Sequence, residues 1–522
     1  MPLPRRCDAV VIGAGHNGLV AATLLARDGL DVVVLERDTV IGGAARTEQP
    51  FTRVPGLRQS TGSYLLGLMP PELEALLDLR LPLVRRDPHY FLPTLTDRYL
   101  LMGSDRSVSR QQLSEFFSEA DAVADDRLAA ELAMLRDDLA PAWLAQPLSI
   151  EETAERHIRP ELRATFVDLV RGDVASYLAR FGFTSELIAA MYAVTDGLSG
   201  LRAGPDDPGT GHNFLVHNMC RLPGSDGTWM IVEGGMGTVS AAIAGRARQH
   251  GAQIVTNASA AEVITRDGFV HGVALADGRT IEADVVVAAC DPFTLASLAP
   301  LPPAVLELLD AVRRPGTTLK VNLALSGLPR FRCLPERAPS PFGSTIHLLA
   351  QDQPMQAVRE MWADVQAGRL PEFPTMEWYL HTTADPSLQD EGGHHSSALF
   401  VQSVPWQPAG SSWDVELDGY VAHLLEICDR FAPGTSGLVA DTFPLPPPGI
   451  EDHFGIRHGH IHHVDNSFGF DQRMPYATGI DGLYAASAGC FPAGSVIGAA
   501  GHNAAQRILA DLGRESSADR RG

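Results

Sequence analysis

Near its start the chain reads Ala9-Val10-Val11-Ile12-Gly13-Ala14-Gly15-His16-Asn17-Gly18, an apolar run that passes directly into a glycine-rich turn. Residues 19–27 continue with apolar side chains at helical spacing. A second apolar run, residues 31–35, ends on Glu36, eighteen residues beyond Gly18. This order of strand, turn, helix, strand and acid predicts a βαβ unit that binds a dinucleotide.

Each glycine of the turn has a mechanical role in such a unit. Gly13 allows the tight turn, Gly15 lets the backbone approach a pyrophosphate, and Gly18 lets the helix pack closely on the strand. The free N–H groups at the start of the helix favour phosphate. Glu36 is expected to accept hydrogen bonds from ribose hydroxyls and to disfavour NADP, because a carboxylate repels a 2′-phosphate. The pattern alone leaves FAD and NAD open.

The composition excludes several classes of protein. With 522 residues the chain can form two or more domains with substantial cores. A net charge of −22 and a pI near 5.2 argue against nucleic acid or an anionic membrane as the main partner. Six cysteines lie far apart without a C-x-x-C pair, which suits a reducing compartment and gives no sign of a zinc site. Lys320 is the single lysine.

No segment of the sequence predicts membrane insertion. The longest apolar runs fall short of the roughly 18 residues that a spanning helix needs. The first apolar run follows Arg5-Arg6 but lacks the small-residue cleavage pattern of a signal peptide. We therefore expect a cytoplasmic protein.

Periodicity predicts how the rest of the chain is arranged. Helices are expected over residues 72–79, 111–139, 150–170, 185–198 and 302–312, and residues 204–226, rich in Gly, Pro and Asp, are expected to form a linker. Short β-rich runs at 319–325, 345–349, 376–381, 399–404 and 458–464 predict a mostly antiparallel sheet. The final strand, turn and helix, residues 482–512, are expected to pack back on the N-terminal unit.

The run Gly42-Gly43-Ala44-Ala45-Arg46-Thr47 follows the second strand. It resembles the double-glycine motif of FAD enzymes in the flavin amine oxidase and phytoene desaturase superfamily. Further echoes cover nearly the whole chain and are most similar to the group called pyridine nucleotide-disulfide oxidoreductase domain-containing protein 2. They include Ser63-Tyr64-Leu65-Leu66, Gly234-Gly235-Met236-Gly237, Asp471-Gln472 and Gly498-Ala499-Ala500-Gly501-His502-Asn503.

The resemblance implies noncovalent FAD as the cofactor and a set of residues that hold it. In this family the double-glycine loop wraps the pyrophosphate, and Arg46 is expected to supply the charge that relatives place at Ala44. Ala260 is expected to contact adenine through its backbone. The predicted cofactor residues are Gly13, Ala14, Gly15, Asn17, Gly18, Glu36, Arg37, Gly42, Gly43, Ala44, Ala45, Arg46, Ala260, Ser487, Ala488, Gly489, Cys490, Gly494, Ser495 and Val496.

The resemblance also implies an α/β fold with a discontinuous Rossmann-like FAD domain and an α+β substrate domain. The expected FAD segments are residues 1–105, 227–300 and 466–522. A helical substrate or lid insertion is expected over 106–226, and a mostly antiparallel substrate sheet over 301–465.

Two departures from the family pattern are visible near the C-terminus. Relatives carry a His-Pro-Gly-Gly-Gly stretch where this chain reads Phe491-Pro492-Ala493-Gly494-Ser495, and residues 473–481 are shorter than usual. Both are expected near the flavin ring. A redox cysteine pair and a second nucleotide motif are missing from the sequence, so NAD(P)H is not expected as an obligatory partner.

Lys320 is the first catalytic candidate, because it resembles the strand lysine that amine oxidase relatives hold near flavin N5. A buried lysine can titrate near neutral pH and accept a proton or orient water. Tyr64, Tyr476 and His502 are further candidates on segments expected beside the cofactor. His460, His462 and His463 suggest a metal cluster, but a strand would turn His463 away from the other two, so no metal is expected.

The main functional prediction is an FAD-dependent oxidoreductase. It would dehydrogenate a small or medium organic substrate at a C–C or C–N bond by hydride transfer to flavin N5, with oxygen or a quinone as acceptor. One alternative is a redox-neutral flavin-dependent double-bond isomerase. Another is a flavin-binding assembly protein without catalysis, which the altered turn at residues 491–495 motivates.

Overall fold

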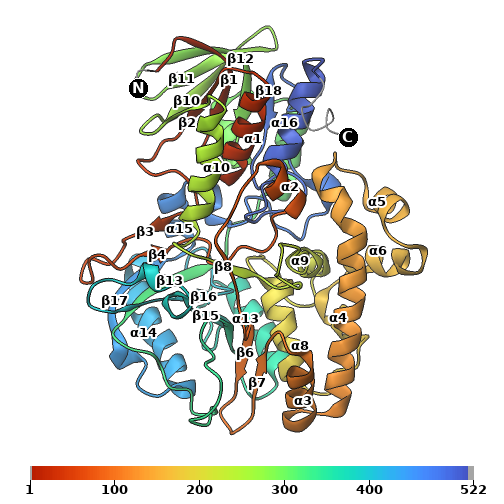
Figure 1. Cartoon of the computed structure of the whole chain (residues 1–522), viewed down its shortest axis with the longest axis vertical. Coiled ribbons are helices and arrows are strands. Elements are labelled where there is room, and N and C mark those ends of the chain that lie inside the picture. The colour runs from red at the N-terminus through yellow and green to blue at the C-terminus, as the bar shows by residue number, and fades with distance from the viewer. Residues whose placement is uncertain (1–2, 515–522) are drawn as a thin grey trace.

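The computed structural model describes residues 3–514 and contains two large sheets, one above the other in Figure 1. The upper sheet is built on β1 (Arg6–Ile12), which pairs in parallel with β2 (Val32–Leu35) and β12 (Thr280–Ala288). Its strand order is β10-β11-β12-β1-β2-β9, with β18 also beside β12. The remaining bounds are β9 Gln253–Val255, β10 Ala260–Arg266, β11 Phe269–Leu275 and β18 Leu483–Ala485.

Three helices cover the parallel part of this sheet. The helices α10 (Gly237–Gln249) and α16 (Ala499–Asp511) both pack on α1 (His16–Arg27), although they come from distant parts of the sequence. The β1 and β2 strands are almost entirely buried, which explains their continuous Val and Ile runs. The predicted βαβ unit and its closure by the C-terminal strand and helix are confirmed.

The lower sheet has the order β17-β13-β16-β15-β14-β6-β7. Its pairs are antiparallel except for the parallel pair of β14 and β6. The strand bounds are β6 Tyr90–Pro93, β7 Tyr99–Met102, β13 Leu319–Leu325, β14 Thr345–Leu348, β15 Met376–Leu380, β16 His395–Val401 and β17 Val439–Leu445. Because β6 and β7 join this sheet, the predicted boundary of the first FAD segment at residue 105 is too late.

A layer of helices lies beside the lower sheet in Figure 1. Its members are α3 Arg106–Phe116, α4 Glu119–Leu139, α5 Ile150–His157, α6 Arg163–Arg171, α7 Val174–Ala179, α8 Glu186–Tyr192, the π-helix η3 Ala193–Leu198 and α9 Thr210–His217. The predicted helix over 111–139 is interrupted because Ser118 caps a new helix by accepting a hydrogen bond from Asp121 N. Of the remaining helices named here, α2 spans Pro71–Leu76, α12 Pro303–Val312, α13 Pro354–Gln366, α14 Trp413–Phe431 and α15 Pro447–Phe454.

Two sequence predictions about local structure are wrong. Residues 204–226 are not a linker, because they contain the buried helix α9, where an added Cβ on Gly211 would lie 2.1 Å from Leu169 O. Glycine there permits close packing. Residues 458–464 form a short 3-10 turn at Arg457–Gly459 and a loop, since His460 and His462 bond to groups outside any ladder.

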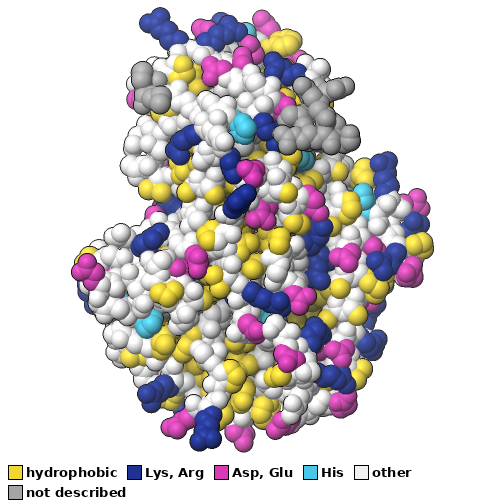
Figure 2. All heavy atoms as spheres, in the orientation of Figure 1, with side chains coloured by type: hydrophobic (Ala, Val, Ile, Leu, Met, Phe, Trp, Pro, Cys, Tyr) yellow, Lys and Arg dark blue, Asp and Glu magenta, His cyan; other side chains and the backbone are white. Residues whose placement is uncertain are grey.

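The surface carries both signs of charge. On the face shown in Figure 2, acidic and basic side chains are interspersed with exposed apolar atoms. Within residues 3–514, no helix combines the length and the apolar character needed to cross a membrane.

Candidate active site

A cavity of about 630 Å³ runs between the two sheets and is lined by residues from both. One end is formed by the glycine turn after β1 and by the ends of β2 and β12. The other end is a chamber on the lower sheet. The cavity therefore joins the predicted cofactor cradle to a second space in one continuous volume.

The cradle begins where α1 starts. Gly15 is the N-cap residue, in extended conformation, and makes no side-chain cap hydrogen bond. A Cβ added to Gly15 would meet no described atom within 4 Å, so this position faces the open cavity. The free N–H groups at the first turn of α1 thus face a space that suits a pyrophosphate.

The double-glycine loop closes the cradle from the opposite side. Gly42 N donates to Ala14 O at 2.8 Å. Gly42 and Gly43 have positive φ angles of 117° and 57°, which favour glycine. A Cβ on Gly43 would lie 3.6 Å from Gly15 Cα, so the two glycine turns approach each other directly.

Glu36 lies at the end of β2, only 8% exposed. Its Oε2 accepts a hydrogen bond from Ala14 N at 2.9 Å and its Oε1 accepts one from Asp38 N at 3.0 Å. Each carboxylate oxygen retains a further lone pair for a ribose hydroxyl. The carboxylate acceptor of Glu36, the free N–H groups of α1 and the open glycine cradle therefore fit a dinucleotide such as FAD.

The structure divides the predicted cofactor residues into two groups. Those that line the cavity are Gly13, Gly15, Asn17, Glu36, Arg37, Gly42, Gly43, Ala44, Ala45, Ala260, Ala488, Ser495 and Val496. Those that lie behind this wall are Ala14, Gly18, Arg46, Ser487, Gly489, Cys490 and Gly494. Members of the second group support the wall: a Cβ on Gly18 would lie 2.2 Å from Gly13 O.

Arg46 does not line the cavity as predicted, and its side chain forms ion pairs behind the cavity wall. Its guanidinium pairs with Asp38 at 2.7 Å and Glu48 at 3.2 Å, and lies 5.1 Å from the ring centre of Phe454. His453 Nε2 lies 2.9 Å from the same Glu48. These contacts fasten α15 against the segment that follows the double glycine, and α15 residues in turn line the cavity.

The chamber end is aromatic. It is lined by Tyr64, Tyr90, Trp229, Tyr379 and Phe400 together with two buried ionisable residues, Lys320 and Glu377. Lys320 Nζ lies 4.3 Å from the ring centre of Tyr64 and 3.8 Å from that of Phe400. Burial lowers the pKa of Lys320 to about 7, while nearby Glu377 acts to raise it. A lysine that titrates near neutral pH can exchange protons with a ligand.

The other three catalytic candidates are not brought together. Tyr64 lines the chamber, and its hydroxyl donates to Asn322 Oδ1 at 3.4 Å. Tyr476 and His502 do not line the cavity. Tyr476 OH donates to Phe491 O at 2.8 Å and accepts from Asn503 Nδ2, while the His502 ring lies 2.8 Å from Asn503 Oδ1. They brace the C-terminal turn and gain no support as catalytic groups.

The departures from the family pattern also lie behind the wall. Phe491 is buried against Phe470, with ring centres 5.3 Å apart, and only Ser495 of residues 491–495 lines the cavity. Of these residues, only Ser495 therefore stays a candidate for contact with the cofactor. The altered turn no longer argues for a protein that has lost its site.

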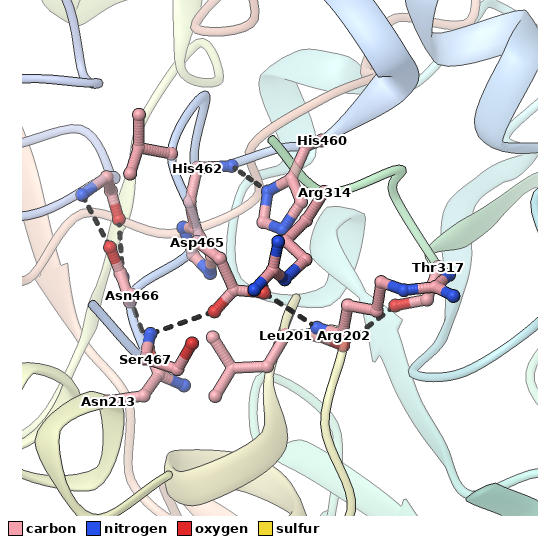
Figure 3. A network of polar contacts seen from close by, with 12 residues as sticks. Leu201, Arg202, Asn213, Arg314, Thr317, His460, His462, Asp465, Asn466 and Ser467 are labelled. Carbon is pink, nitrogen blue, oxygen red and sulfur yellow. Dashed lines mark hydrogen bonds and ion pairs between the residues drawn. The ribbon is translucent and has the colours of Figure 1, made fainter. Parts of the chain in front are cut away.

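Sequence reasoning missed a buried polar network that shapes the cavity wall (Figure 3). His460 Nε2 lies 3.0 Å from Asp465 Oδ2, and Asp465 also accepts from Arg202 N. His462 lines the cavity, and its Nε2 donates to Ser199 O at 2.9 Å. Burial lowers the pKa of His462 to about 4, so this ring is neutral at pH 7. His460 and His462 thus fasten this loop to Asp465 and to Ser199, the residue that follows η3.

Comparison with known proteins agrees with this geometry. Residues 18–370 match the family described as flavin containing amine oxidoreductase. A pyridine nucleotide-disulfide oxidoreductase domain-containing protein 2 from Rattus norvegicus is 33% identical, covering 97% of this chain and 94% of the relative. A zeta-carotene-forming phytoene desaturase from Myxococcus xanthus is 26% identical, covering 78% and 74%. Wild-type putrescine oxidase bound to putrescine shares the fold, with a TM-score of 0.59 at 16% identity over 97% and 99% of the chains.

Proposed function

The chain belongs to the family of flavin-containing amine oxidoreductases, and from this premise we propose that it dehydrogenates a small or medium organic substrate. The protein is an FAD-dependent oxidoreductase, as the resemblance predicted. One observation carries the finer proposal: a single cavity connects the dinucleotide cradle with an aromatic chamber that contains the chain's one lysine. A substrate in this chamber would adjoin the cofactor without leaving the cavity.

The residues that would hold FAD are those of the cradle. The first turn of α1 and the glycines at 13, 15, 42 and 43 would accommodate the pyrophosphate, and Glu36 would accept from a ribose hydroxyl. The chemistry that FAD supplies when bound is the acceptance of a hydride from the substrate. The chain itself must orient the substrate and take up the proton that the oxidation releases.

Lys320 is the group proposed to handle that proton. Among the described residues no hydrogen bond or ion pair is found for its Nζ, which lies against the rings of Tyr64 and Phe400. A nitrogen that titrates near pH 7 can accept a proton at neutral pH and return it to water later. The surrounding aromatic side chains exclude bulk water and give the substrate an apolar surface.

Two descriptions from the comparisons support the two kinds of dehydrogenation that the sequence suggested, at a C–C bond and at a C–N bond. One relative is named a zeta-carotene-forming phytoene desaturase, and the family that matches residues 18–370 is described as flavin containing amine oxidoreductase. Oxygen or a quinone would then accept the electrons. Production of hydrogen peroxide with substrate would identify an oxidase, and turnover only with an artificial quinone would identify a dehydrogenase.

The experiment that tests the proposal follows the flavin bands. Purified protein should show them in its visible spectrum, and acid precipitation should release them into the supernatant. Anaerobic mixing with panels of unsaturated compounds and amines should bleach the bands for at least one class. Lys320→Met should keep FAD bound but slow reduction or reoxidation by tenfold or more. Equal rates for both half-reactions in this variant would contradict the role of Lys320.

A further inference from the structure

Lys320 and Glu377 lie in one row across the lower sheet. Lys320 on β13 is directly opposite Phe400 on β16, and Phe400 is directly opposite Glu377 on β15. Residues that face each other across neighbouring strands project from the same face. Two strand spacings of about 4.8 Å separate the lysine from the glutamate. Both side chains line the cavity, and they come from the strands on either side of the one that carries Phe400.

Few groups around Lys320 stabilise its protonated form. Its Nζ packs against two aromatic rings, which attract a cation, but burial removes its hydration. Glu377 is the acidic group that acts on Lys320 and favours its protonated form. His381 is the titratable group of the same sign that feels the lysine charge, and burial keeps His381 neutral by lowering its pKa to about 4.

Glu377 is itself held by groups from several elements. Tyr379 donates its hydroxyl to Glu377 Oε2, and no partner with good hydrogen-bond geometry is found for Oε1 within residues 3–514. Burial raises the pKa of Glu377, while Tyr379, Thr195, Lys320 and Arg86 oppose this rise. The other titratable groups that face it are Tyr64, Tyr90 on β6, Asp196 on η3 and His347, which is opposite Glu377 on β14.

We propose that Glu377 is the counter-ion of Lys320 and favours the protonated form of this lysine, acting across β16, the strand that carries Phe400. Glu377 is thus a positioning residue that determines whether an ammonium or a free amine meets the substrate. This inference rests on the proposed role of Lys320. The charge relation can nevertheless be measured in the resting protein, whether or not any donor reduces the flavin.

The single lysine makes the measurement direct. Protein grown with lysine labelled with ¹³C at Cε gives one side-chain resonance, whose chemical shift reports the protonation of Lys320. The FAD-loaded wild type should titrate near pH 7. Glu377→Gln should lower the midpoint by about one pH unit, a tenfold change in the acid dissociation constant. That is the Coulomb effect of one charge at about 10 Å with an effective dielectric constant of about 20.

Two further variants make the test specific. Tyr379→Phe keeps the ring but removes the hydroxyl that stabilises the Glu377 charge, so the midpoint should fall in the same direction by a smaller amount. Asp125→Asn changes a buried acid on α4 that bonds to Tyr192 outside the cavity, and it should leave the midpoint unchanged. FAD content verifies that each variant folds.

Either of two results would overturn the inference. An unchanged midpoint in Glu377→Gln would mean that Glu377 is already neutral beside Lys320. If that variant does not fold, an unchanged midpoint in Tyr379→Phe leads to the same conclusion. A shift of equal size in Asp125→Asn would show that the effect comes from general changes in the protein and not from the paired carboxylate.

Discussion

Alanine substitutions at Gly15 and Gly18, three residues apart, should have different effects. An added Cβ on Gly15 has no described atom within 4 Å and projects into the cavity, and the φ of −71° at this residue suits any L residue. An added Cβ on Gly18 lies 2.2 Å from Gly13 O and 2.8 Å from Ala289 Cβ. Gly15→Ala should therefore impair the cofactor site, and Gly18→Ala should impair the fold.

The contacts set the size of each effect. To restore normal contact distances in Gly18→Ala, α1 must move by roughly 1 Å from β1, and overpacking of this kind costs about 1–3 kcal/mol of unfolding free energy. Gly15→Ala should lower the stability of the apoprotein by only about 0.5 kcal/mol, because alanine is a poorer N-cap residue than glycine. Its methyl group occupies the approach to the pyrophosphate, so FAD affinity should fall at least tenfold, or about 1.4 kcal/mol.

Urea unfolding of the two apoproteins, followed by circular dichroism, measures the first quantity. Titration with FAD, followed by flavin fluorescence, measures the second. The wild-type apoprotein is the reference for both. The assignment of Gly15 to the cavity wall would be refuted if Gly15→Ala bound FAD as the wild type does, or if its apoprotein were destabilised as much as that of Gly18→Ala.

Three further changes have expected outcomes. Burial lowers the pKa of Lys320 from 10.5 to about 7. Between these two pH values the lysine is protonated in the unfolded chain and neutral in the folded protein, so this group makes the unfolding free energy of the wild type rise by about 1.4 kcal/mol per pH unit. Urea unfolding from pH 7 to 10 should show that the unfolding free energy of Lys320→Met lacks this contribution to the rise with pH; the same pH dependence in both proteins would contradict it. Gly494→Ala places a Cβ 2.4 Å from the His462 Cβ and should lower the unfolding free energy by about 1–3 kcal/mol, with an unchanged denaturation midpoint as the opposing result. Glu48→Gln removes the carboxylate that pairs with Arg46 and contacts His453, and it should speed FAD dissociation severalfold by loosening α15; rapid dilution into flavin-free buffer, followed by flavin fluorescence, would measure this, and equal rates would show that α15 does not retain the cofactor.

The sequence predicted the elements whose signal is local. The bounds expected for the strand at Leu319–Leu325 match β13, since a short apolar run between Pro-rich segments describes a buried strand well. The glycine turn and Glu36 were likewise found, because every member of that motif lies within thirty residues of the next. The fold class and the family resemblance were confirmed on the same basis.

The errors arise where a residue's partner is distant in the sequence. His460 and His462 were expected on a strand because residues 458–464 form a short β-rich run, but their bonds to Asp465 and Ser199 O bury them in a loop. Arg46 was expected at the cofactor because of its charge, but Asp38 and Glu48 neutralise it first. Pattern alone does not show which acid an arginine will meet.

Glu377 is the instructive omission. In Met376-Glu377-Trp378-Tyr379 a glutamate between apolar residues predicts a strand with one face in water, yet this side chain is only 3% exposed. Glu377 is important for the site because strand pairing through Phe400 places it in one row with Lys320, fifty-seven residues earlier. The single lysine could be selected from the sequence because it was unique. Its counter-ion could be recognised only once strand order and register were known, since a shift of one residue in either pairing would turn Glu377 to the opposite face.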